Sequence, residues 1–339
     1  MSDDKRQALL KVVEQINKKF GDNTVVVLGE SADRLKVEVI PTQSLLLNYA
    51  LGIGGLPKGR ITEIYGPAHS GKTGICLGAV AECQRLGGTA AWIDAENAMD
   101  PDYARLLGVD LNGMFYCQPP NGEEAINIAE ALINSGGLDL LVIDSVAALV
   151  PSAEVEAEME QNLIGTHARL MSKALRKLVG TVARNNTALV FINQTREKVG
   201  VMYGSPEITT GGNALKFYAS VRIEVRRGEE FKKKDEVIGH TLRCRIVKNR
   251  LAMPFKRCEF PVYYGKGVDT NYELLELGVH LGIIKRTGSW FAVEINGEQH
   301  KVNSKDAFVA YLNEHPEVRD FIKGRIFSSF SGVPVGAAT

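Results

Sequence analysis

Apolar residues near the start of the chain recur at the spacing of a helix. This spacing of three and four residues predicts an amphipathic helix over residues 4–20, with a stripe made by Ala8, Leu9, Val12, Val13, Ile16 and Phe20. Gly21 ends the pattern, and residues 24–28 are typical of a strand. One helix and one strand bury too little apolar surface to fold alone. We therefore expect this module to pack on the main domain or on another chain.

From residue 61 the pattern changes to short β-rich runs that alternate with helical segments. Strands are predicted at 61–65, 90–94, 138–144 and 188–193, with the last two at 221–225 and 241–247, and helices at 72–86, 123–135 and 166–184. The run at 138–144 is almost wholly apolar, as is typical of a parallel strand covered on both faces. Alternation of this kind predicts an α/β fold in which helices flank a mostly parallel sheet.

The pattern changes again near residue 270. A helix at 271–281, a strand at 290–295 and a helix at 304–327 predict a small α+β domain, and the uncharged residues 331–339 favour a flexible tail. A chain of 339 residues also exceeds what one hydrophobic core usually holds. The expected parts are an N-terminal helix–strand arm, a large α/β core, a small C-terminal domain and a tail, at 1–33, 34–269, 270–330 and 331–339.

Charge and cysteine content narrow the class of protein. The 40 basic and 40 acidic residues give a net charge of zero, so bulk charge does not attract nucleic acid, although a local basic face can. The five cysteines contain no CxxC pair, which favours reduced, mostly buried thiols. No apolar run reaches the roughly 18 residues of a membrane span, and the N-terminus has no apolar signal core. We expect a cytoplasmic protein with no membrane association.

A glycine-rich segment between a predicted strand and a predicted helix matches the pattern GxxxxGK[ST]. It consists of Gly66, Pro67, Ala68, His69, Ser70, Gly71, Lys72 and Thr73. Glycines allow a tight turn that directs backbone N–H groups at phosphate oxygens, and the N-terminus of the following helix adds a positive dipole end. Lys72 would reach the β- and γ-phosphates, and the Thr73 hydroxyl would bind Mg²⁺. The segment predicts binding of a nucleoside triphosphate, for which we expect ATP.

Carboxylates follow two of the predicted buried strands. Asp144 ends the apolar run noted above and is followed by Ser145, at the sheet edge where ligands bind in α/β folds. Asp144 is therefore the expected acid of the Mg²⁺ shell, with a strand-end cap as the alternative. Glu96 lies two residues past another strand and is the expected group that orients or deprotonates water. A plain surface acid is the alternative for Glu96.

These motifs together resemble the RecA family of bacterial recombinases. The matching stretches are 66–73, 93–96, 100–105, 142–149, 191–194, 209–220 and 247–249. The phosphate loop alone would indicate a superfamily, whereas TTGGNALKFYAS, placed just after FINQ, is specific enough to name the family. The resemblance implies a RecA-like ATPase core that forms filaments on single-stranded DNA, pairs that strand with a homologous duplex and exchanges strands. It also implies co-activation of the self-cleavage of LexA-type repressors in the SOS response.

The resemblance implies roles for individual residues at the nucleotide. Glu96 is then the catalytic carboxylate, and Gln194 is the γ-phosphate sensor that couples the nucleotide to the DNA loops. Asp100 and Tyr103 are the expected adenine contacts, Tyr103 by stacking.

Lys248 and Arg250 resemble the pair that reaches into the ATP site of the neighbouring subunit. They are two residues apart, so on an extended segment they point the same way. Two cations directed at a triphosphate from another chain would neutralise charge in the transition state and make hydrolysis depend on assembly. A solvated basic strand end is the alternative. The N-terminal helix and strand resemble the segment that docks on the adjacent subunit of a filament.

Two predicted loops beside the sheet, 156–165 and 195–210, correspond to the loops that hold single-stranded DNA in the resembled family. The first loop is acidic and would not by itself suggest DNA; the resemblance assigns Ile164 to it as a base-stacking wedge. The second loop contains cations and glycines that could track phosphates. Its expected DNA contacts, with those of the segment that follows, are Arg196, Lys198, Val199, Gly211, Gly212 and Asn213.

Further arginines are expected to contact DNA. Arg169 and Arg176 lie seven apart on a predicted helix, so they share a face, and they resemble DNA-contacting arginines of the family. A second basic group on adjacent strands resembles the weaker site for the incoming duplex and comprises Arg226, Arg227, Arg243 and Arg245. A solvated charged edge is the alternative for this group.

The chain departs from the family at two places. Ala68 and His69 stand where the family usually has an acid and a serine, but the GK[ST] core is intact and binding is expected to persist. No charged residue follows Arg325, where the family has a long acidic tail, so we expect easier loading onto duplex DNA. Two other functions stay open: a hexameric helicase-like motor on the same core, and a non-catalytic nucleotide-switched scaffold, which the presence of Glu96 disfavours.

Overall fold

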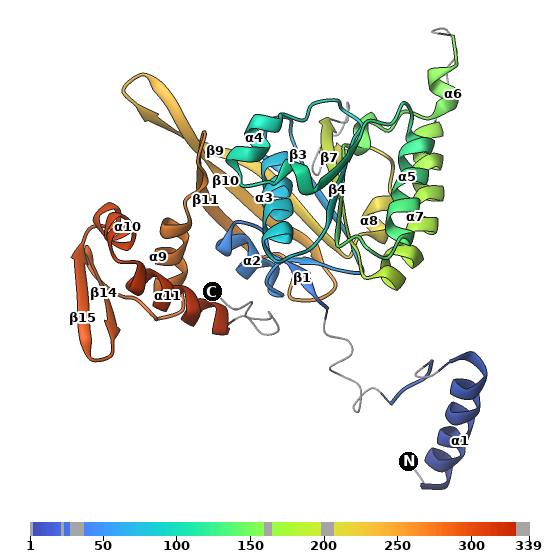
Figure 1. Cartoon of the computed structure of the whole chain (residues 1–339), viewed down its shortest axis with the longest axis horizontal. Coiled ribbons are helices and arrows are strands. Elements are labelled where there is room, and N and C mark those ends of the chain that lie inside the picture. Colours follow the sequence, from blue (N-terminus) through green and yellow to red (C-terminus); the bar gives the residue numbers. More distant parts are fainter. Residues whose placement is uncertain (1–2, 22–23, 28–36, 159–164, 198–206, 330–339) are drawn as a thin grey trace. The chain divides into compact units, whose positions relative to one another are not determined.

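The computed structural model describes residues 3–21, 24–27, 37–158, 165–197 and 207–329 (Figure 1). The chain divides into two compact units, Met1–Val37 and Glu38–Thr339. In the first, α1 (Asp3–Phe20) confirms the helix predicted at 4–20, and the Asn17 side chain bonds to both backbone groups of Val25. The strand predicted at 24–28 is wrong for its described part, since residues 24–27 have no neighbouring strand to pair with among the described residues of this unit.

The core of the second unit is a ten-stranded sheet whose centre is parallel. The order β9-β3-β7-β6-β4-β5 contains parallel pairs only. Its strands are β3 (Ile61–Gly66), β4 (Ala90–Asp94), β5 (Met114–Cys117), β6 (Leu140–Asp144), β7 (Ala188–Glu197) and β9 (Val221–Lys233). The carboxyl ends of β3, β4, β6 and β7 therefore meet at one edge, where the predicted nucleotide residues lie.

Antiparallel strands extend the sheet beyond β9. In order they are β10 (Glu236–Asn249), β11 (Arg257–Tyr263) and β12 (Gly267–Val268), while β8 (Glu207–Thr209) pairs with the end of β7. The prediction that 221–225 and 241–247 are the last two strands is therefore wrong: both are longer than expected, and β11 and β12 follow them. Pro261 and the charged residues of β11 break the apolar alternation that would have indicated this strand.

Helices cover both faces of the sheet, as the alternating pattern predicts (Figure 1). One face packs on α2 (Leu45–Leu51), α3 (Lys72–Arg85) and α4 (Pro101–Leu106), and the other on α5 (Gly122–Asn134), α7 (Thr166–Asn185) and α8 (Ala214–Tyr218). Along β4, Ala90 and Trp92 point to the first face, whereas Ala91 and Ile93 point to the second. The α/β fold class with a mostly parallel sheet is confirmed.

Two further short elements belong to this part of the chain. They are the β1–β2 ladder (Val39–Ile40 with Leu56–Pro57) and α6 (Ser152–Val155).

The last part of the chain has its own hydrophobic core. It contains α9 (Thr270–His280), a three-stranded antiparallel sheet of β13 (Lys285–Thr287), β14 (Trp290–Ile295) and β15 (Glu298–Asn303), then α10 (Lys305–Glu314) and α11 (Pro316–Ser329). The single helix predicted at 304–327 is wrong, because Pro316 begins a second helix. The four-part division of the chain stays a prediction, and the predicted tail 331–339 lies outside the described residues.

Candidate nucleotide-binding and active site

The glycine-rich segment joins the end of β3 to the start of α3, as predicted. A side chain at Gly66 would place its Cβ 2.0 Å from the carbonyl oxygen of Val225, so only glycine fits this close approach. Gly71, the N-cap of α3, has a φ of 90° and makes no side-chain capping bond. The first N–H groups of α3 are therefore available to an anion, with the positive end of the helix dipole behind them.

Lys72 is a buried cation whose charge needs an anion. Its Nζ donates to the carbonyl oxygens of Pro67, at 2.6 Å, and Gly66, at 3.3 Å. Burial lowers the pKa of Lys72, while Asp144 and Glu96 oppose that shift. A polyphosphate in the loop would compensate the desolvated charge better than carbonyl dipoles do. The loop therefore fits the triphosphate that its sequence predicts.

His69 occupies a left-handed position in the loop. Its φ is 56°, a region that histidine enters more readily than most residues, and its side chain is exposed. Nothing in the structure explains the alanine at position 68.

Thr73, at the start of α3, lies next to Asp144, at the carboxyl end of β6. Thr73 Oγ1 donates to Asp144 Oδ2 at 3.1 Å. Burial and then the charge of Glu96 raise the pKa of Asp144 to about 7, so this carboxylate is short of positive charge. Within the described ranges no cluster of three or more metal-ligating side chains occurs. This donor set fits Mg²⁺, which takes few protein ligands and completes its shell with water and phosphate oxygens.

Glu96 is held between two side chains from other strand ends. Ser145 Oγ donates to Glu96 Oε1, and Gln194 Nε2 donates to the same oxygen at 2.6 Å. The backbone N–H groups of Ala95 and Glu96 donate to the carbonyl oxygen of Asp144. The structure thus brings together the predicted water-activating acid, the predicted sensor and the Mg²⁺ acid.

Asp94 fixes the loop that carries Glu96, a role that the sequence analysis did not assign. Its carboxylate accepts bonds from the N–H groups of Ala98 and Met99, each at 3.0 Å, and from the Tyr116 hydroxyl at 2.9 Å. Burial and the bond to Asp94 raise the pKa of Tyr116 to about 12. An aspartate within the apolar strand AAWID is the signal that could have indicated a structural carboxylate here.

A small enclosed apolar cavity lies beside α3, next to the phosphate loop. Tyr103, Tyr264 and His240 line it, and the Tyr103 hydroxyl lies 2.9 Å from where a Cβ at Gly74 would stand. Neither ring nitrogen of His240 has a hydrogen-bond partner in the described part of the chain, and burial lowers the pKa of this histidine. Asp100 does not line the cavity; its side chain caps α4 by accepting from the N–H of Tyr103. Aromatic rings such as that of Tyr103 offer faces on which a planar base stacks, but the cavity itself holds only about 60 Å³.

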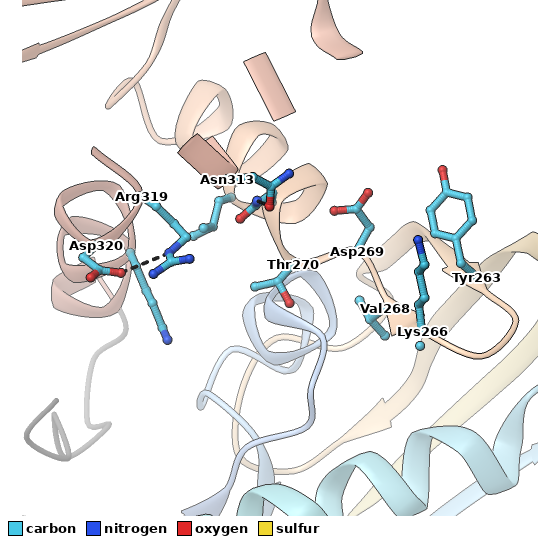
Figure 2. Close-up of a pocket in the computed structure, with 12 residues that line it drawn as sticks. Tyr263, Lys266, Val268, Asp269, Thr270, Asn313, Arg319 and Asp320 are labelled. Carbon is cyan, nitrogen blue, oxygen red and sulfur yellow. Dashed lines mark hydrogen bonds and ion pairs between the residues drawn. The ribbon is translucent and has the colours of Figure 1, made fainter. Parts of the chain in front are cut away.

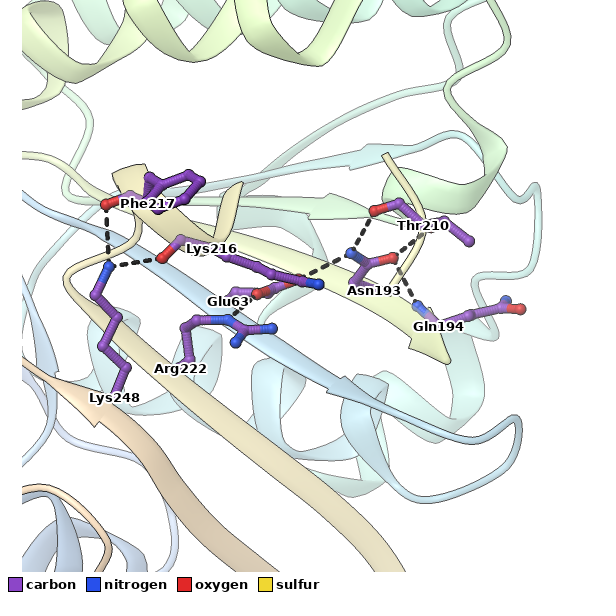
Figure 3. Close-up of polar contacts among 8 residues, drawn as sticks. All are labelled: Glu63, Asn193, Gln194, Thr210, Lys216, Phe217, Arg222 and Lys248. Carbon is purple, nitrogen blue, oxygen red and sulfur yellow. Dashed lines mark hydrogen bonds and ion pairs between the residues drawn. The ribbon is translucent and has the colours of Figure 1, made fainter. Parts of the chain in front are cut away.

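Lys248 is anchored on the end of α8 (Figure 3), and Arg250 is anchored there as well. Lys248 Nζ donates to the carbonyl oxygens of Lys216, at 2.7 Å, and Phe217, at 3.0 Å, and Arg250 Nη2 also donates to that of Phe217. Burial, followed by the charges of Arg250 and Arg222, lowers the pKa of Lys248 to about 8. These cations lie together, as the two-residue spacing predicts, and the last carbonyls of α8 hold them.

A separate buried polar network runs from Arg222, which is opposite Lys248 in the β9–β10 ladder, to the end of β7 (Figure 3). Arg222 pairs with Glu63, which is fully buried on β3, and Asn193 donates to Glu63 at 2.8 Å. Asn193 Oδ1 in turn accepts from the Thr210 hydroxyl and from the N–H of Gln194. The sequence analysis missed Glu63 and Arg222; an acid within the apolar strand ITEIYG is the signal for a buried pair.

Some of the predicted DNA-contacting residues lie in the described part of the chain, and others lie outside it. Arg196 lines one hollow together with Gly211, Gly212 and Asn213, and this hollow also includes His167 and Lys216. Arg169 and Arg176 are exposed on α7, as their spacing predicts. Three further predicted contacts, Ile164, Lys198 and Val199, lie outside the described residues, as do 159–164 and 198–206 of the two loops.

The second basic group is largely paired with carboxylates. Arg226 binds Glu207 and Glu224. Arg227 binds Glu230, Arg243 binds Glu259, and Arg245 lies opposite Glu224 in the β9–β10 ladder. A phosphate backbone would therefore have to compete with these acids for the arginines.

A polar groove lies between the β11–β12 hairpin and the C-terminal helices (Figure 2). Lys266 and Asp269 lie on the hairpin side, while Asn313 and the Arg319–Asp320 pair face them from the helices. No residue predicted for the nucleotide or DNA sites lines this groove.

No helix in the described ranges is both long enough and apolar enough to cross a membrane.

Comparison with known proteins identifies relatives along nearly the whole chain. The family model described as RecA N-terminal domain matches residues 7–269, and that described as RecA C-terminal domain matches residues 272–331. The chain is 50% identical to Protein RecA of Dichelobacter nodosus, over 98% of this chain and 94% of the relative. It is 52% identical to Protein RecA of Gluconacetobacter polyoxogenes, over 95% of this chain and 92% of the relative.

Proposed function

The chain belongs to the RecA family of recombinases, and we propose that it is an ATP-dependent homologous recombination protein. In this proposal it forms helical filaments on single-stranded DNA, pairs that strand with homologous double-stranded DNA and exchanges strands. DNA binding stimulates its hydrolysis of ATP.

One arrangement carries the proposal: Glu96 held by Ser145 and Gln194 beside the Thr73–Asp144 pair. A scaffold that only binds nucleotide needs the phosphate loop but has no use for a carboxylate placed beside the γ-phosphate position. A side chain that reports the γ-phosphate is equally unnecessary there. The arrangement therefore supports an ATPase in which the state of the nucleotide reaches the end of β7.

The residues of the site divide the work of hydrolysis. The loop N–H groups and Lys72 bind and orient the phosphates, and Glu96 takes a proton from, or orients, the attacking water. Mg²⁺ held by Thr73 and Asp144 would neutralise charge on the phosphate oxygens when bound. Tyr103, beside α3, is the proposed stacking partner of the adenine, and Asp100 stays a proposed adenine contact at the cap of α4.

We propose that Lys248 and Arg250 act on the nucleotide of the neighbouring subunit. Arginine-finger cations stabilise charge that develops in the transition state. Within one subunit the carbonyls of Lys216 and Phe217 hold both side chains, so assembly has to redirect them. The exposed Phe217 lies at the same place and favours a contact surface here.

Single-stranded DNA is proposed to follow the hollow that contains Arg196 and Gly211–Asn213, with Arg169 and Arg176 beside it. The Asn193 bonds to Thr210 and Gln194 support a link between this hollow and the nucleotide. The paired arginines Arg226, Arg227, Arg243 and Arg245 are the proposed weaker site for the duplex. Co-activation of a LexA-type repressor is proposed from family membership alone.

An ATPase assay with and without single-stranded DNA tests the proposal. We expect DNA to raise the rate several-fold and Lys72→Ala to abolish nucleotide binding; Lys58→Ala, which removes a cation outside the loop, is the control. Electron micrographs of the same sample should show open helical filaments. Closed rings would favour the hexameric motor, and nucleotide binding without turnover would favour the scaffold.

A further inference from the structure

Two cysteines face each other across the antiparallel edge of the sheet. Cys244 on β10 and Cys258 on β11 are directly opposite in the ladder, so their side chains lie on the same face of the sheet. Both are free cysteines. In the described part of the chain no other two cysteines pair across neighbouring strands. The proposed ATPase mechanism uses neither thiol.

The geometry of this pair is compatible with a covalent bond. Two backbone hydrogen bonds lie at the ends of this ladder, from Ile246 N to Lys256 O and from Tyr264 N to Ile238 O. In an antiparallel ladder every second pair of opposite residues is hydrogen-bonded. Counting from these bonds, Cys244 and Cys258 form a hydrogen-bonded pair. Such residues have Cα atoms about 5.5 Å apart, inside the range that a disulfide spans. Their Cβ atoms lie about 5.5 Å apart, whereas a disulfide needs about 4 Å. Closing the bond would therefore have to bring the two Cβ atoms about 1.5 Å closer.

The bond would enclose the segment that carries the proposed trans-acting cations. Lys248 and Arg250 lie between the two cysteines, four and six residues past Cys244 on the same strand end. The carbonyl groups that hold these two side chains belong to α8. A shift of β10 would therefore move the backbone of the two cations relative to the carbonyl groups. Misplacing a catalytic group by about 1 Å can cost on the order of 100-fold in rate.

We propose that Cys244 and Cys258 form a redox-sensitive site, which peroxide converts to an intrachain disulfide that fastens the 244–258 hairpin and slows DNA-stimulated ATP hydrolysis. The effect on hydrolysis rests on the proposed function; the disulfide itself does not.

The chemistry uses hydrogen peroxide as the oxidant. In the small fraction of the protein in which the half-buried Cys258 is a thiolate, its sulfur attacks one peroxide oxygen, the O–O bond breaks, and the departing hydroxide takes a proton to become water. The Cys244 sulfur then attacks the resulting sulfenic acid, the S–S bond forms, and the S–O bond breaks with loss of a second water. In sum, two thiols and one peroxide give one disulfide and two waters.

The reduced pair is stable without oxidant. The hydrogen bond with Cys244 and then burial raise the pKa of Cys258 well above its usual value, so the thiol form persists at neutral pH. Cys244 is only 2% exposed, which excludes large oxidants from its sulfur. A small peroxide acting over minutes to hours suits such a site.

The first experiment treats the full-length protein with hydrogen peroxide, without nucleotide or DNA, and then blocks free thiols and analyses peptides by mass spectrometry. We expect one linked peptide pair that joins Cys244 to Cys258 and disappears on reduction with dithiothreitol. Cys117→Ser, which removes a half-buried thiol elsewhere, should leave this link unchanged, and Cys244→Ser should abolish it. Sulfinic acid on either residue without a linked pair, or links made instead by Cys117, would overturn the site.

The second experiment measures DNA-stimulated hydrolysis of the linked protein. We expect a loss of tenfold or more that dithiothreitol reverses, and no peroxide effect in Cys244→Ser. Full activity in protein shown to be linked would overturn the regulatory role. Reduced protein without any DNA-stimulated hydrolysis would instead point to failure of the proposed function, while the link itself could still form.

Discussion

Glu96 accepts hydrogen bonds from two residues that are 49 and 98 positions away in the chain. This convergence gives single residues distinct roles: Ser145 and Gln194 orient the acid, and Asp94 fixes its loop through the bonds to Ala98 and Met99. At this scale the strand-end cap proposed as an alternative for Asp144 loses support, because this carboxylate accepts a hydrogen bond from Thr73 of the phosphate loop. Glu96 is exposed and bonds to Ser145 and Gln194, so its catalytic role stays a prediction.

Replacing Glu96 by glutamine tests the role of the acid. Glutamine keeps the size and can still accept from Ser145, but it cannot take a proton from water. We expect nucleotide binding to persist and hydrolysis to fall by about 100-fold or more, the range for loss of a general base. Isothermal titration and an ATPase assay measure the two effects.

The control for Glu96→Gln is Asp102→Asn, which changes an exposed acid paired with Arg105 on α4. It should alter neither binding nor turnover. Loss of nucleotide binding in Glu96→Gln would show that this carboxylate is structural.

The residues found only from the structure share one property: their partners are distant in sequence. His240 and Tyr264 reach the cavity beside α3 from β10 and the end of β11, and no local pattern marks them. Glu63 and Asp94 could have been inferred as structural acids, since both interrupt apolar strands. The phosphate loop was predictable because all of its chemistry lies within eight consecutive residues.

At the scale of elements, helix and strand periods predicted five of the six parallel strands of the sheet but missed β5. β4 and β14 coincide with the predicted ranges. The errors lie where periodicity is weak: β11 contains a proline, α2 has only seven residues, and Pro316 divides a helical stretch. Tertiary contacts, more than local propensity, define these elements.

The anchored pair at the end of β10 provides a test at this scale. Replacing Lys248 and Arg250 together by alanine should leave the ATP affinity of the separate subunit nearly unchanged, because neither contacts its phosphate loop. DNA-stimulated hydrolysis should fall by about 1000-fold, as for loss of an arginine finger. A fluorescent-nucleotide titration and a DNA-dependent ATPase assay measure the two quantities.

Lys232→Ala with Lys233→Ala, at the far end of the β9–β10 hairpin, is the matched double control. Hydrolysis that persists in the Lys248 and Arg250 variant would rule out the action in trans.

Glu273 on α9 bonds to the start of α2, and its titration makes the stability of this contact depend on pH. Its buried carboxyl accepts bonds from Ser44 Oγ and the N–H of Leu45, yet burial raises its pKa from 4.5 to about 8. A raised folded-state pKa means that the stabilising contribution is complete below pH 4.5 and is lost as pH rises toward 8. The loss is on the order of a few kcal/mol, at about 1.4 kcal/mol per pKa unit.

We therefore expect the melting temperature of the protein to fall between pH 5 and pH 9 more steeply than in Glu273→Gln, which cannot titrate. Calorimetry across this range measures the difference. Glu276→Gln, on the same helix but only half-buried and paired with Lys305, should keep the slope of the unsubstituted protein. Equal slopes in all three proteins would show that Glu273 does not titrate in this window.

At the scale of the whole molecule, α1 carries an apolar stripe without cover. Leu9 is 59% exposed and Phe20 is 67% exposed. A helix with such a stripe gains stability only by burying it on another surface. In the proposed filament, a second copy of the chain would cover this stripe.

Replacing Leu9 and Val12 by aspartate should abolish filaments while ATP still binds, because burying two carboxylates in an apolar contact is unfavourable. Electron microscopy and light scattering with single-stranded DNA measure assembly. The control, Lys11→Asp with Lys18→Asp, changes the charge on the same helix but leaves the stripe intact. We expect this control to form longer filaments than the stripe variant. Filaments of normal length in the Leu9 and Val12 variant would mean that the stripe has another purpose.

Strand exchange between a circular single strand and a homologous linear duplex tests the central claim most directly. With ATP we expect joint molecules and then complete exchange products on a gel; without ATP, or with a heterologous duplex, we expect neither. A protein that hydrolyses ATP in response to single-stranded DNA but never forms homologous joints would contradict the assignment as a recombination protein.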